Sequence, residues 1–134
     1  MTYLWLVLAL ALQASLVNGK LVVHRNVKLT PSDVCAKPDH IDPCGIPRCN
    51  RQVSEATKRA VFKEYGIDYA KHECCEVDHL IPLELGGSNS IKNLWPEPWA
   101  EAHEKDKLEN SLNQRVCKKE TTLKDAQHAI LGAH

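Results

Sequence analysis

Residues 76–87 read EVDHLIPLELGG, and residues 93–96 read NLWP. The first of these stretches places Asp78 and His79 side by side, ahead of a Gly-Gly pair. A carboxylate is a hard metal ligand, and an imidazole can act as a general base. The pair therefore offers both groups within one short piece of backbone.

The residues around this stretch predict two strands and a helix. Residues 74–79 suit a strand, and residues 91–95 suit a returning strand. Gly86-Gly87 supplies a conformationally permissive turn between them. A helix is expected from about residue 99 to residue 116, so the predicted order is strand, strand, helix.

This pattern resembles the HNH endonuclease family. The ββα-metal motif of that family carries an Asp-His or His-His pair, an asparagine later in the hairpin and a third histidine on the following helix. His79 and Asn93 are fourteen positions apart, as in the family motif. The stretch DHLIPLELGGSNSIKNLWPEP, with the later AHEKDKLEN and VC, also resembles a group of small HNH-type proteins common in bacteria. The resemblance covers roughly residues 51–131, and its specific part is confined to residues 78–109.

The resemblance implies a role for each of four residues. His79 is the implied general base, since a free imidazole titrates near neutrality and can take a proton from water. Asn93 is the second implied catalytic residue, which orients the loop through a side-chain amide that both donates and accepts hydrogen bonds. Asp78 is the implied metal ligand, and His103 on the helix is the implied second metal ligand.

The helix is the least regular part of the match. His103 lies ten residues after Asn93, one residue further than the commonest spacing. It shares one helix face with Asp106, roughly opposite an apolar face. If the apolar face packs on the core, the His103 face can point away from the hairpin. If the hairpin packs on the His103 face, His103 and Asp106 both approach the site. The alternative ligands are Asp106 and Glu109.

These roles predict a metal-dependent endonuclease that hydrolyses nucleic-acid phosphodiester bonds. His79 would deprotonate water for attack on phosphorus. A divalent ion on Asp78 and His103 would offset charge on the phosphate and on the departing 3′ oxygen. The expected ion is Mg²⁺, Mn²⁺ or Zn²⁺, the resemblance favours DNA over RNA, and a monomer is the default oligomeric state.

Two other interpretations remain open. The balanced charge and the irregular third ligand fit a non-catalytic secreted binding or effector protein that retains the HNH-like scaffold. The other interpretation is a zinc module, although the paired CxxC spacing of structural zinc sites is absent. Its ligands would be His72, Cys74, Cys75 and Cys117. A nucleotide-binding loop at Gly86-Gly87 is rejected, because no Gly-Lys-Ser/Thr follows.

The N-terminal part of the chain predicts export. Residues 1–19 contain no charged side chain and include an apolar run too short to span a bilayer, which is typical of a signal peptide, here cleaved after Gly19. We therefore expect a secreted protein without a membrane anchor. Residues 20–52, rich in proline and cysteine, are expected to wrap the HNH-like domain, residues 53–134.

All six cysteines follow the predicted signal peptide. An even number of cysteines in a small exported chain predicts disulfides. The sequence leaves the pairing open, except that adjacent Cys74 and Cys75 are not expected to pair, because the vicinal geometry is strained.

Acidic and basic residues are balanced, with 17 of each in 134 residues. Tight non-specific binding of nucleic acid by phosphate neutralisation is therefore not predicted. A metal ion would add positive charge that this count omits. A local basic stripe remains open, formed by Lys58, Arg59, Lys63, Lys92, Lys105 and Lys107.

Two further helices complete the prediction. Ser54 can cap a helix that runs to Tyr65. Thr122 and Asp125 have capping-box spacing ahead of a helix that runs to Leu131. The expected fold is a single small α+β domain held by disulfides, in which the ββα-metal motif has flanking helices.

Overall fold

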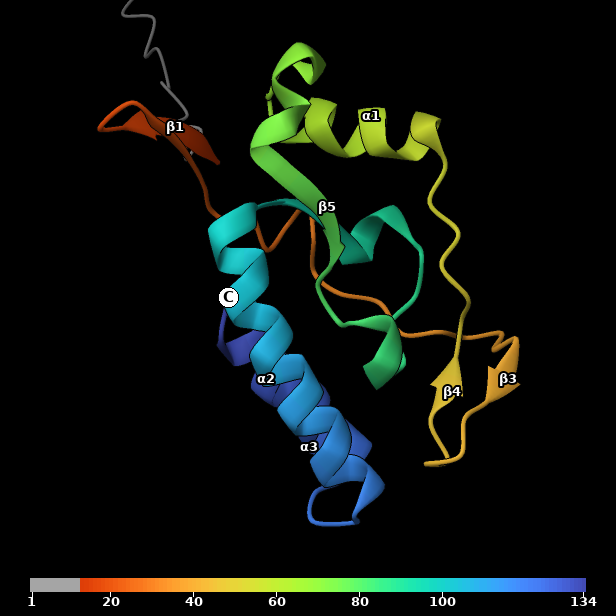
Figure 1. The fold of residues 1–134 in the computed structure, drawn as a ribbon. Coiled ribbons are helices and arrows are strands. Elements are labelled where there is room, and N and C mark those ends of the chain that lie inside the picture. Colours follow the sequence, from red (N-terminus) through yellow and green to blue (C-terminus); the bar gives the residue numbers. More distant parts are fainter. Residues whose placement is uncertain (1–12) are drawn as a thin grey trace, which may run out of the picture.

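The computed structural model describes residues 13–134 (Figure 1). This part of the chain forms a small mixed α/β domain, which confirms the predicted α+β class. Its strands form three two-stranded antiparallel sheets: β1 (Ala14–Val17) with β2 (Lys20–Val23), β3 (His40–Ile41) with β4 (Pro47–Arg48), and β5 (Cys75–His79) with β6 (Leu94–Pro98). Its α-helices are α1 (Glu55–Glu64), α2 (Trp99–Cys117) and α3 (Leu123–Gly132), and its 3₁₀ helices are η1 (Tyr69–Cys74), η2 (Leu83–Leu85) and η3 (Ile91–Asn93).

The β5–β6 hairpin and α2 follow one another in the predicted order. In the hairpin, His79 pairs with Leu94 and Asp78 pairs with Trp95. The returning strand begins at Leu94 rather than at residue 91, because Ser90 caps η3 by accepting a hydrogen bond from the Lys92 amide. The prolines of β6 are tolerated because a strand in a two-stranded sheet has one edge without ladder hydrogen bonds.

Helix α2 packs on the hairpin and on α3 through one face (Figure 1). The buried residues of α2 recur every three or four positions, which defines this inward face. They are Ala102, Lys105, Glu109, Leu112 and Val116. The predicted apolar face therefore does pack on the core, but it also carries two charged residues.

The other two helices begin where the sequence predicts. The side chain of Ser54 accepts a hydrogen bond from the Thr57 amide at 3.1 Å, and α1 ends before Gly66, whose φ of 68° is left-handed. Thr122 caps α3 in the same way, with its side chain accepting from the Asp125 amide at 3.1 Å.

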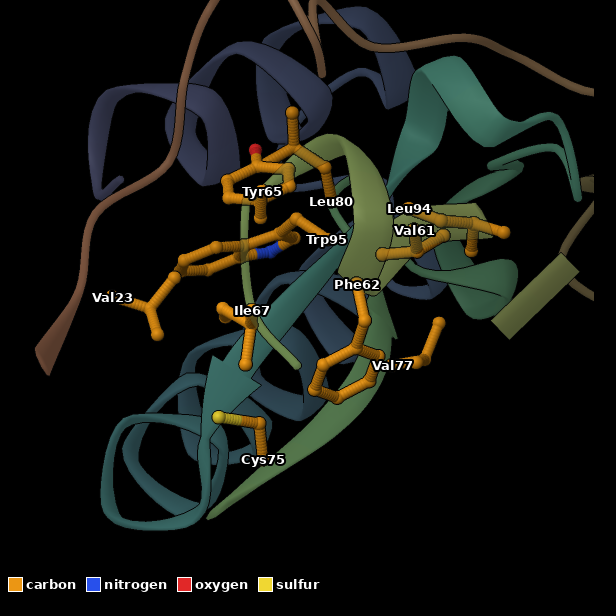
Figure 2. Close-up of a cluster of buried hydrophobic side chains, with 10 residues drawn as sticks. All are labelled: Val23, Val61, Phe62, Tyr65, Ile67, Cys75, Val77, Leu80, Leu94 and Trp95. Atoms are coloured by element: carbon orange, nitrogen blue, oxygen red, sulfur yellow. The ribbon is translucent and has the colours of Figure 1, made fainter. Parts of the chain in front are cut away.

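Two apolar clusters form the core. The larger one lies between the hairpin, α1 and β2, with the rings of Tyr65 and Trp95 near its centre (Figure 2). It consists of Val23, Val61, Phe62, Tyr65, Ile67, Cys75, Val77, Leu80, Leu94 and Trp95. The second cluster lies between η2, α2 and α3, and consists of Ile46, Ile81, Leu85, Leu112, Val116, Ala126 and Ile130.

The segment before α1 lies along this core. Thr30 is fully buried, and its hydroxyl is 2.7 Å from the Tyr65 hydroxyl and donates to the Leu94 carbonyl at 3.1 Å. Further along, the Cys35 amide donates to the Gly86 carbonyl at 2.8 Å. These contacts join the proline- and cysteine-rich segment to the start of β6 and to the middle of the hairpin loop.

The predicted signal peptide, residues 1–19, lies mostly outside the described residues, which begin at residue 13. Its last part forms β1, which pairs with β2 through a turn at Asn18 and Gly19, both with positive φ. The signal peptide therefore stays a prediction. Within residues 13–134, no helix is both long enough and apolar enough to cross a membrane.

All six cysteines form disulfides, which confirms that part of the prediction. The pairs are Cys35–Cys49, Cys44–Cys117 and Cys74–Cys75. The expectation that Cys74 and Cys75 do not pair was wrong. Cys74 ends η1 and Cys75 starts β5, so the change from 3₁₀ to extended backbone lets the two adjacent side chains meet. In this state no cysteine has a free thiolate for the zinc module.

Replacing both Cys44 and Cys117 with serine is expected to lower the free energy of unfolding by about 2–5 kcal/mol. The reason is that this bond closes a sequence separation of 73 residues, which restricts the unfolded chain most. Loop length alone makes the loss about 1.5 kcal/mol larger than for a serine pair at Cys35 and Cys49, which are separated by 14 residues. Denaturant unfolding of both variants measures this difference, and equal losses would contradict it.

Candidate active site

Asp78 and His79 point to opposite faces of the hairpin. They are consecutive residues of β5, and side chains alternate along a strand. Asp78 lies on the face toward α2, where it meets Lys105. His79 lies on the other face, where it meets Arg51 and Asn89. The adjacent carboxylate and imidazole are therefore not directed at one common point.

Asn93 braces the loop that joins the two strands. Its side chain is fully buried, and its Oδ1 accepts from the Ile81 amide at 3.0 Å. Its Nδ2 donates to the carbonyls of Ile81 and Ser88 at 3.0 and 2.9 Å. Gly87 fits this loop because an added Cβ would lie 1.7 Å from the Ile81 carbonyl oxygen. These contacts hold the backbone just after His79, and the catalytic role that the resemblance implies for Asn93 stays a prediction.

The hydrogen bonds of Asn89 determine which nitrogen of His79 carries the proton. Asn89 Nδ2 donates to the Asn50 carbonyl at 2.8 Å, and Oδ1 accepts from the Gln52 amide at 3.1 Å, which fixes the orientation of the side-chain amide. Oδ1 is 3.0 Å from His79 Nε2, so Nε2 must be the donor. Nδ1 then carries the lone pair, and it faces Arg51 Nη1 at 3.5 Å.

Burial lowers the pKa of His79, while the hydrogen bond to Asn89 opposes this effect. The residue is 3% exposed, and the neutral imidazole is the form that this environment favours. His79 therefore presents an unprotonated nitrogen, Nδ1, beside the guanidinium of an exposed arginine, Arg51.

Lys105 is the α2 residue that reaches Asp78. Its side chain is fully buried, and its Nζ lies 2.7 Å from Asp78 Oδ2 and 2.8 Å from Glu109 Oε1. Nζ also donates to the His79 carbonyl at 2.5 Å. Burial alone would lower the pKa of Lys105, but the charges of Asp78 and Glu109 outweigh it and raise the pKa. Lys105 is therefore a buried cation, not part of the basic stripe considered from the sequence.

Glu97 completes the buried charged cluster. Its side chain is fully buried, and Oε2 is 4.0 Å from Lys105 Nζ. Burial, together with the hydrogen bond and charge of Asp78, raises the pKa of Glu97 to about 10. The consistent arrangement is a protonated Glu97 that donates to Asp78, since neither Glu97 oxygen has another partner. For Asp78, burial favours a higher pKa, but the Glu97 hydrogen bond and the Lys105 charge together keep it below its usual value.

The predicted helical ligand does not join Asp78. His103 is exposed, with its ring beside Trp99 at 6.4 Å between centroids, and Asp106 is exposed as well. Glu109, the other alternative, is already bound to Lys105. Within residues 13–134, no three His, Cys, Asp or Glu side chains form a group that could hold a metal ion. The reason is the rotation of α2, whose inward face carries Lys105 and Glu109 instead of His103.

The described residues therefore do not fit a divalent ion held by Asp78 and His103. Lys105 Nζ takes the hydrogen-bonding position at Asp78 Oδ2 that a metal would need. A metal requirement of the protein stays a prediction from the resemblance.

Four residues of this site were missed by sequence reasoning: Arg51, Asn89, Glu97 and Lys105. Only Lys105 had a local signal, because it lies three residues after Ala102 and seven before Leu112 on the buried face of α2. The other three come together through contacts between distant segments, which the sequence pattern does not show.

A cleft of about 360 Å³ lies between α1, η1 and β5. His79 does not line this cleft, but Arg51 does, and Arg51 also contacts His79 Nδ1 at 3.5 Å. The other lining residues are Glu55, Lys58, Phe62, Tyr69, His72, Cys75, Glu76, Val77 and Trp99. The basic and aromatic side chains of the cleft suit a phosphate and a stacked base, whereas its two carboxylates, Glu55 and Glu76, oppose a phosphate.

Comparison with protein-family models, with curated proteins and with solved structures found no match for this chain. The geometry of the site and the resemblance of its motif are therefore the two indications of what this chain does.

Replacing Glu97 with glutamine is expected to remove a pH dependence of stability. Glu97 has its pKa raised from 4.5 to about 10 in the folded protein, so folding takes up a proton across this interval. The stability that this proton provides is present at low pH and is lost as the pH rises toward 10. The native protein should lose about 1.4 kcal/mol per pH unit from this group.

The glutamine side chain in the Glu97→Gln variant would keep a donor toward Asp78 without binding a proton. Denaturant unfolding of both proteins at about pH 6 and about pH 8 measures the difference between their slopes. Parallel slopes would show that Glu97 is ionised in the folded protein.

Proposed function

We propose that the chain is a nuclease with an HNH-like hairpin, in which His79 Nδ1 is the general base and Arg51 binds the phosphate. The observation that carries this proposal is the fixed tautomer of His79, which directs an unprotonated nitrogen at a guanidinium beside a cleft. By the resemblance, DNA is the proposed substrate.

The disulfides fit an oxidising compartment, and we propose that the protein is secreted.

The reaction assigns one task to each group. His79 Nδ1 takes a proton from water, whose oxygen attacks phosphorus as the bond to the 3′ oxygen breaks. The resulting imidazolium returns its proton to the solvent, and the departing 3′ oxygen takes a proton from a second water. Arg51 offsets the charge on the phosphate oxygens, for which a guanidinium can donate two parallel hydrogen bonds.

Arg51 must move to perform this task, because it covers Nδ1 in the present structure. Its contacts favour such a movement. Nη1 lies 3.5 Å from His79 Nδ1, Nη2 lies 3.4 Å from the Val77 carbonyl, and the side chain is exposed. A phosphate in the cleft offers the guanidinium shorter, charge-assisted hydrogen bonds and uncovers the base.

The test uses oxidised protein with plasmid DNA, single-stranded DNA and RNA, each with Mg²⁺, Mn²⁺, Zn²⁺ or EDTA. We expect DNA cleavage that persists in EDTA and is strongly reduced in Arg51→Ala. The matched control is Arg115→Ala, since Arg115 is an exposed arginine that pairs with Glu120 near the far end of α2. Cleavage that EDTA abolishes would contradict the metal-free arrangement and support the metal-dependent enzyme that the resemblance implies.

A second candidate is a non-catalytic binding protein that retains the scaffold. The observation in its favour is that both ring nitrogens of His79 have partners and the residue is almost fully buried. The same samples decide between the two candidates. Intact DNA in every arm, with DNA retained by the protein in a binding assay, would support the second candidate.

A further inference from the structure

We propose that the cleft lined by Arg51 binds an unpaired guanine, which stacks on Trp99 and donates hydrogen bonds to the carboxylate of Glu76. The inference rests on the proposed function, because it names the base that accompanies the phosphate at Arg51. It gives the nuclease a substrate class, namely nucleic acid with a guanine that lies outside the double helix, in a single strand or flipped out of a duplex.

Trp99 is an exposed aromatic ring with a fixed orientation. It is 48% exposed, and it is the only aromatic residue among the exposed large hydrophobic side chains of residues 13–134. Its Nε1 donates to the Glu73 carbonyl at 3.0 Å. The ring of His103 lies 6.4 Å away and is tilted by 43°, so it does not stack on Trp99. A ring that is already held in place loses little conformational entropy when a base stacks on it.

Tyr69, the other large aromatic ring at the surface of the cleft, is already occupied. The Arg59 guanidinium lies over this ring at 4.3 Å from its centroid, and the His72 ring stacks on it at 4.5 Å. The ring of Phe62 meets it edge-on at 5.5 Å. Trp99 is therefore the ring of the cleft that is available to a base.

Glu76 is the carboxylate of the cleft that lacks a partner. It is half-buried on β5, and within the described residues no hydrogen bond or ion pair reaches its carboxylate. Burial and the charges of Asp78 and Asp106 raise the pKa of Glu76, so its surroundings do not compensate the charge. Glu55, in contrast, accepts from the Tyr69 hydroxyl and lies 4.0 Å from Arg59. Glu76 is therefore free to accept hydrogen bonds from a ligand.

The Watson–Crick edge of guanine matches such a carboxylate. Guanine presents two adjacent donors, N1–H and N2–H, which one carboxylate can accept in two parallel hydrogen bonds. Adenine and cytosine each present one amino donor next to an unprotonated ring nitrogen, which a carboxylate repels. Thymine presents one donor between two carbonyl oxygens. The carboxylate that opposes a phosphate in this cleft is therefore the group that selects the base.

The positions along the chain place the base near the phosphate. The Glu73 carbonyl holds Trp99, and the Val77 carbonyl accepts from Arg51 Nη2 at 3.4 Å. These carbonyls are four residues apart, so they are separated by at most about 14 Å, and Glu76 lies between them. The cleft volume of about 360 Å³ is within the usual range for small-ligand sites, about 300–1,000 Å³. A base on Trp99 and a phosphate at Arg51 would belong to the same or to adjacent nucleotides.

The test is the binding of the four deoxynucleoside monophosphates to oxidised protein, measured by isothermal titration and by quenching of tryptophan fluorescence. We expect deoxyguanosine monophosphate to bind about 5–150-fold more tightly than the other three, which is the usual discrimination of a bidentate contact to a base. Deoxyinosine monophosphate, which lacks the N2 amino group, should bind more weakly than deoxyguanosine monophosphate. Quenching should accompany binding, because the exposed ring of Trp99 receives the base.

Two variants separate the selecting residue from the stacking residue. Glu76→Gln should bring the affinities for guanine and adenine close together, because an amide offers one donor and one acceptor and fits either base. The matched control is Glu73→Gln, since Glu73 is an exposed glutamate of η1 that does not line the cleft, and it should keep the preference. Trp99→Ala should weaken the binding of all four monophosphates by about 5–150-fold, as expected for the loss of one stacking contact.

Equal affinities of the wild type for the four monophosphates, or binding of none of them, would overturn the proposal. A folded Trp99→Ala with unchanged affinities would overturn it as well. If Trp99→Ala does not fold, the comparison between the wild type, Glu76→Gln and Glu73→Gln decides alone.

The monophosphates contain no phosphodiester bond, so their binding is independent of cleavage. A protein that cleaves DNA but binds the four monophosphates alike would retain the proposed function and overturn this inference. Selective binding of deoxyguanosine monophosphate without cleavage of any nucleic acid would support the guanine site and contradict the nuclease.

Discussion

Replacing Lys105 with methionine is expected to lower the free energy of unfolding by about 3–5 kcal/mol at slightly alkaline pH, because it leaves buried carboxylates without a counterion. Methionine keeps most of the apolar stem and removes only the ammonium that contacts Asp78 and Glu109. The loss should shrink as the pH falls. Without the ammonium, the pKa values of both carboxyls rise, and the folded state then takes up protons that neutralise them.

Denaturant unfolding at about pH 8 and about pH 5.5 measures this effect. Lys107→Met is the control, because Lys107 is an exposed lysine on the same helix and pairs only with exposed Glu104. Adding Asp78→Asn to Lys105→Met should restore part of the lost stability, since it removes one of the unpaired charges. A loss in Lys105→Met no larger than in Lys107→Met would show that the buried cluster does not hold the hairpin to α2.

Replacing His79 with alanine is expected to reduce phosphodiester cleavage by about 10²–10⁴-fold, which is the usual contribution of a general base. The substitution removes Nδ1, the unprotonated nitrogen beside Arg51, and leaves the backbone contacts of Asn93 in place. Added imidazole should restore part of the activity by occupying the vacated space. Initial rates on plasmid DNA, with circular dichroism of each variant, measure the effect.

His103→Ala is the matched control for this experiment, since His103 is an exposed histidine beside Trp99. Its activity should stay close to that of the wild type. If His103→Ala loses activity and excess metal restores it, the ligand set implied by the HNH resemblance is correct and the role assigned to Arg51 is wrong.

The helices of this fold could be predicted because their signals are local. Ser54 and Thr122 each cap a helix within three residues of their own position, and both hydrogen bonds are present. The start of β6 was predicted three residues too early, because residues 91–93 form η3, which is capped by Ser90, and Asn93 is held by the carbonyls of Ile81 and Ser88. The Cys74–Cys75 bond likewise depends on the change of backbone conformation between η1 and β5.

In the candidate site as well, residues with a local sequence signal could be predicted, and residues placed by packing could not. The motif identified His79 and Asn93, and the structure places both at the loop that closes the hairpin. The sequence could not show which face of α2 packs on the hairpin, because helical periodicity defines two faces but not what each face contacts. Lys105 was therefore counted as a surface charge, and only its contacts with Asp78 and Glu109 show otherwise.

In the proposed secreted nuclease, the Cys44–Cys117 bond would protect the cell that makes it. Asp78, His79, Asn93 and Lys105 all lie within the segment of chain that this bond closes. In a reducing cytosol the bond does not persist, so the segment lacks its tether and the site is held less firmly. An exported chain would acquire the bond only after leaving the compartment that contains the genome of its producer. We therefore expect full cleavage activity to arise outside the cell.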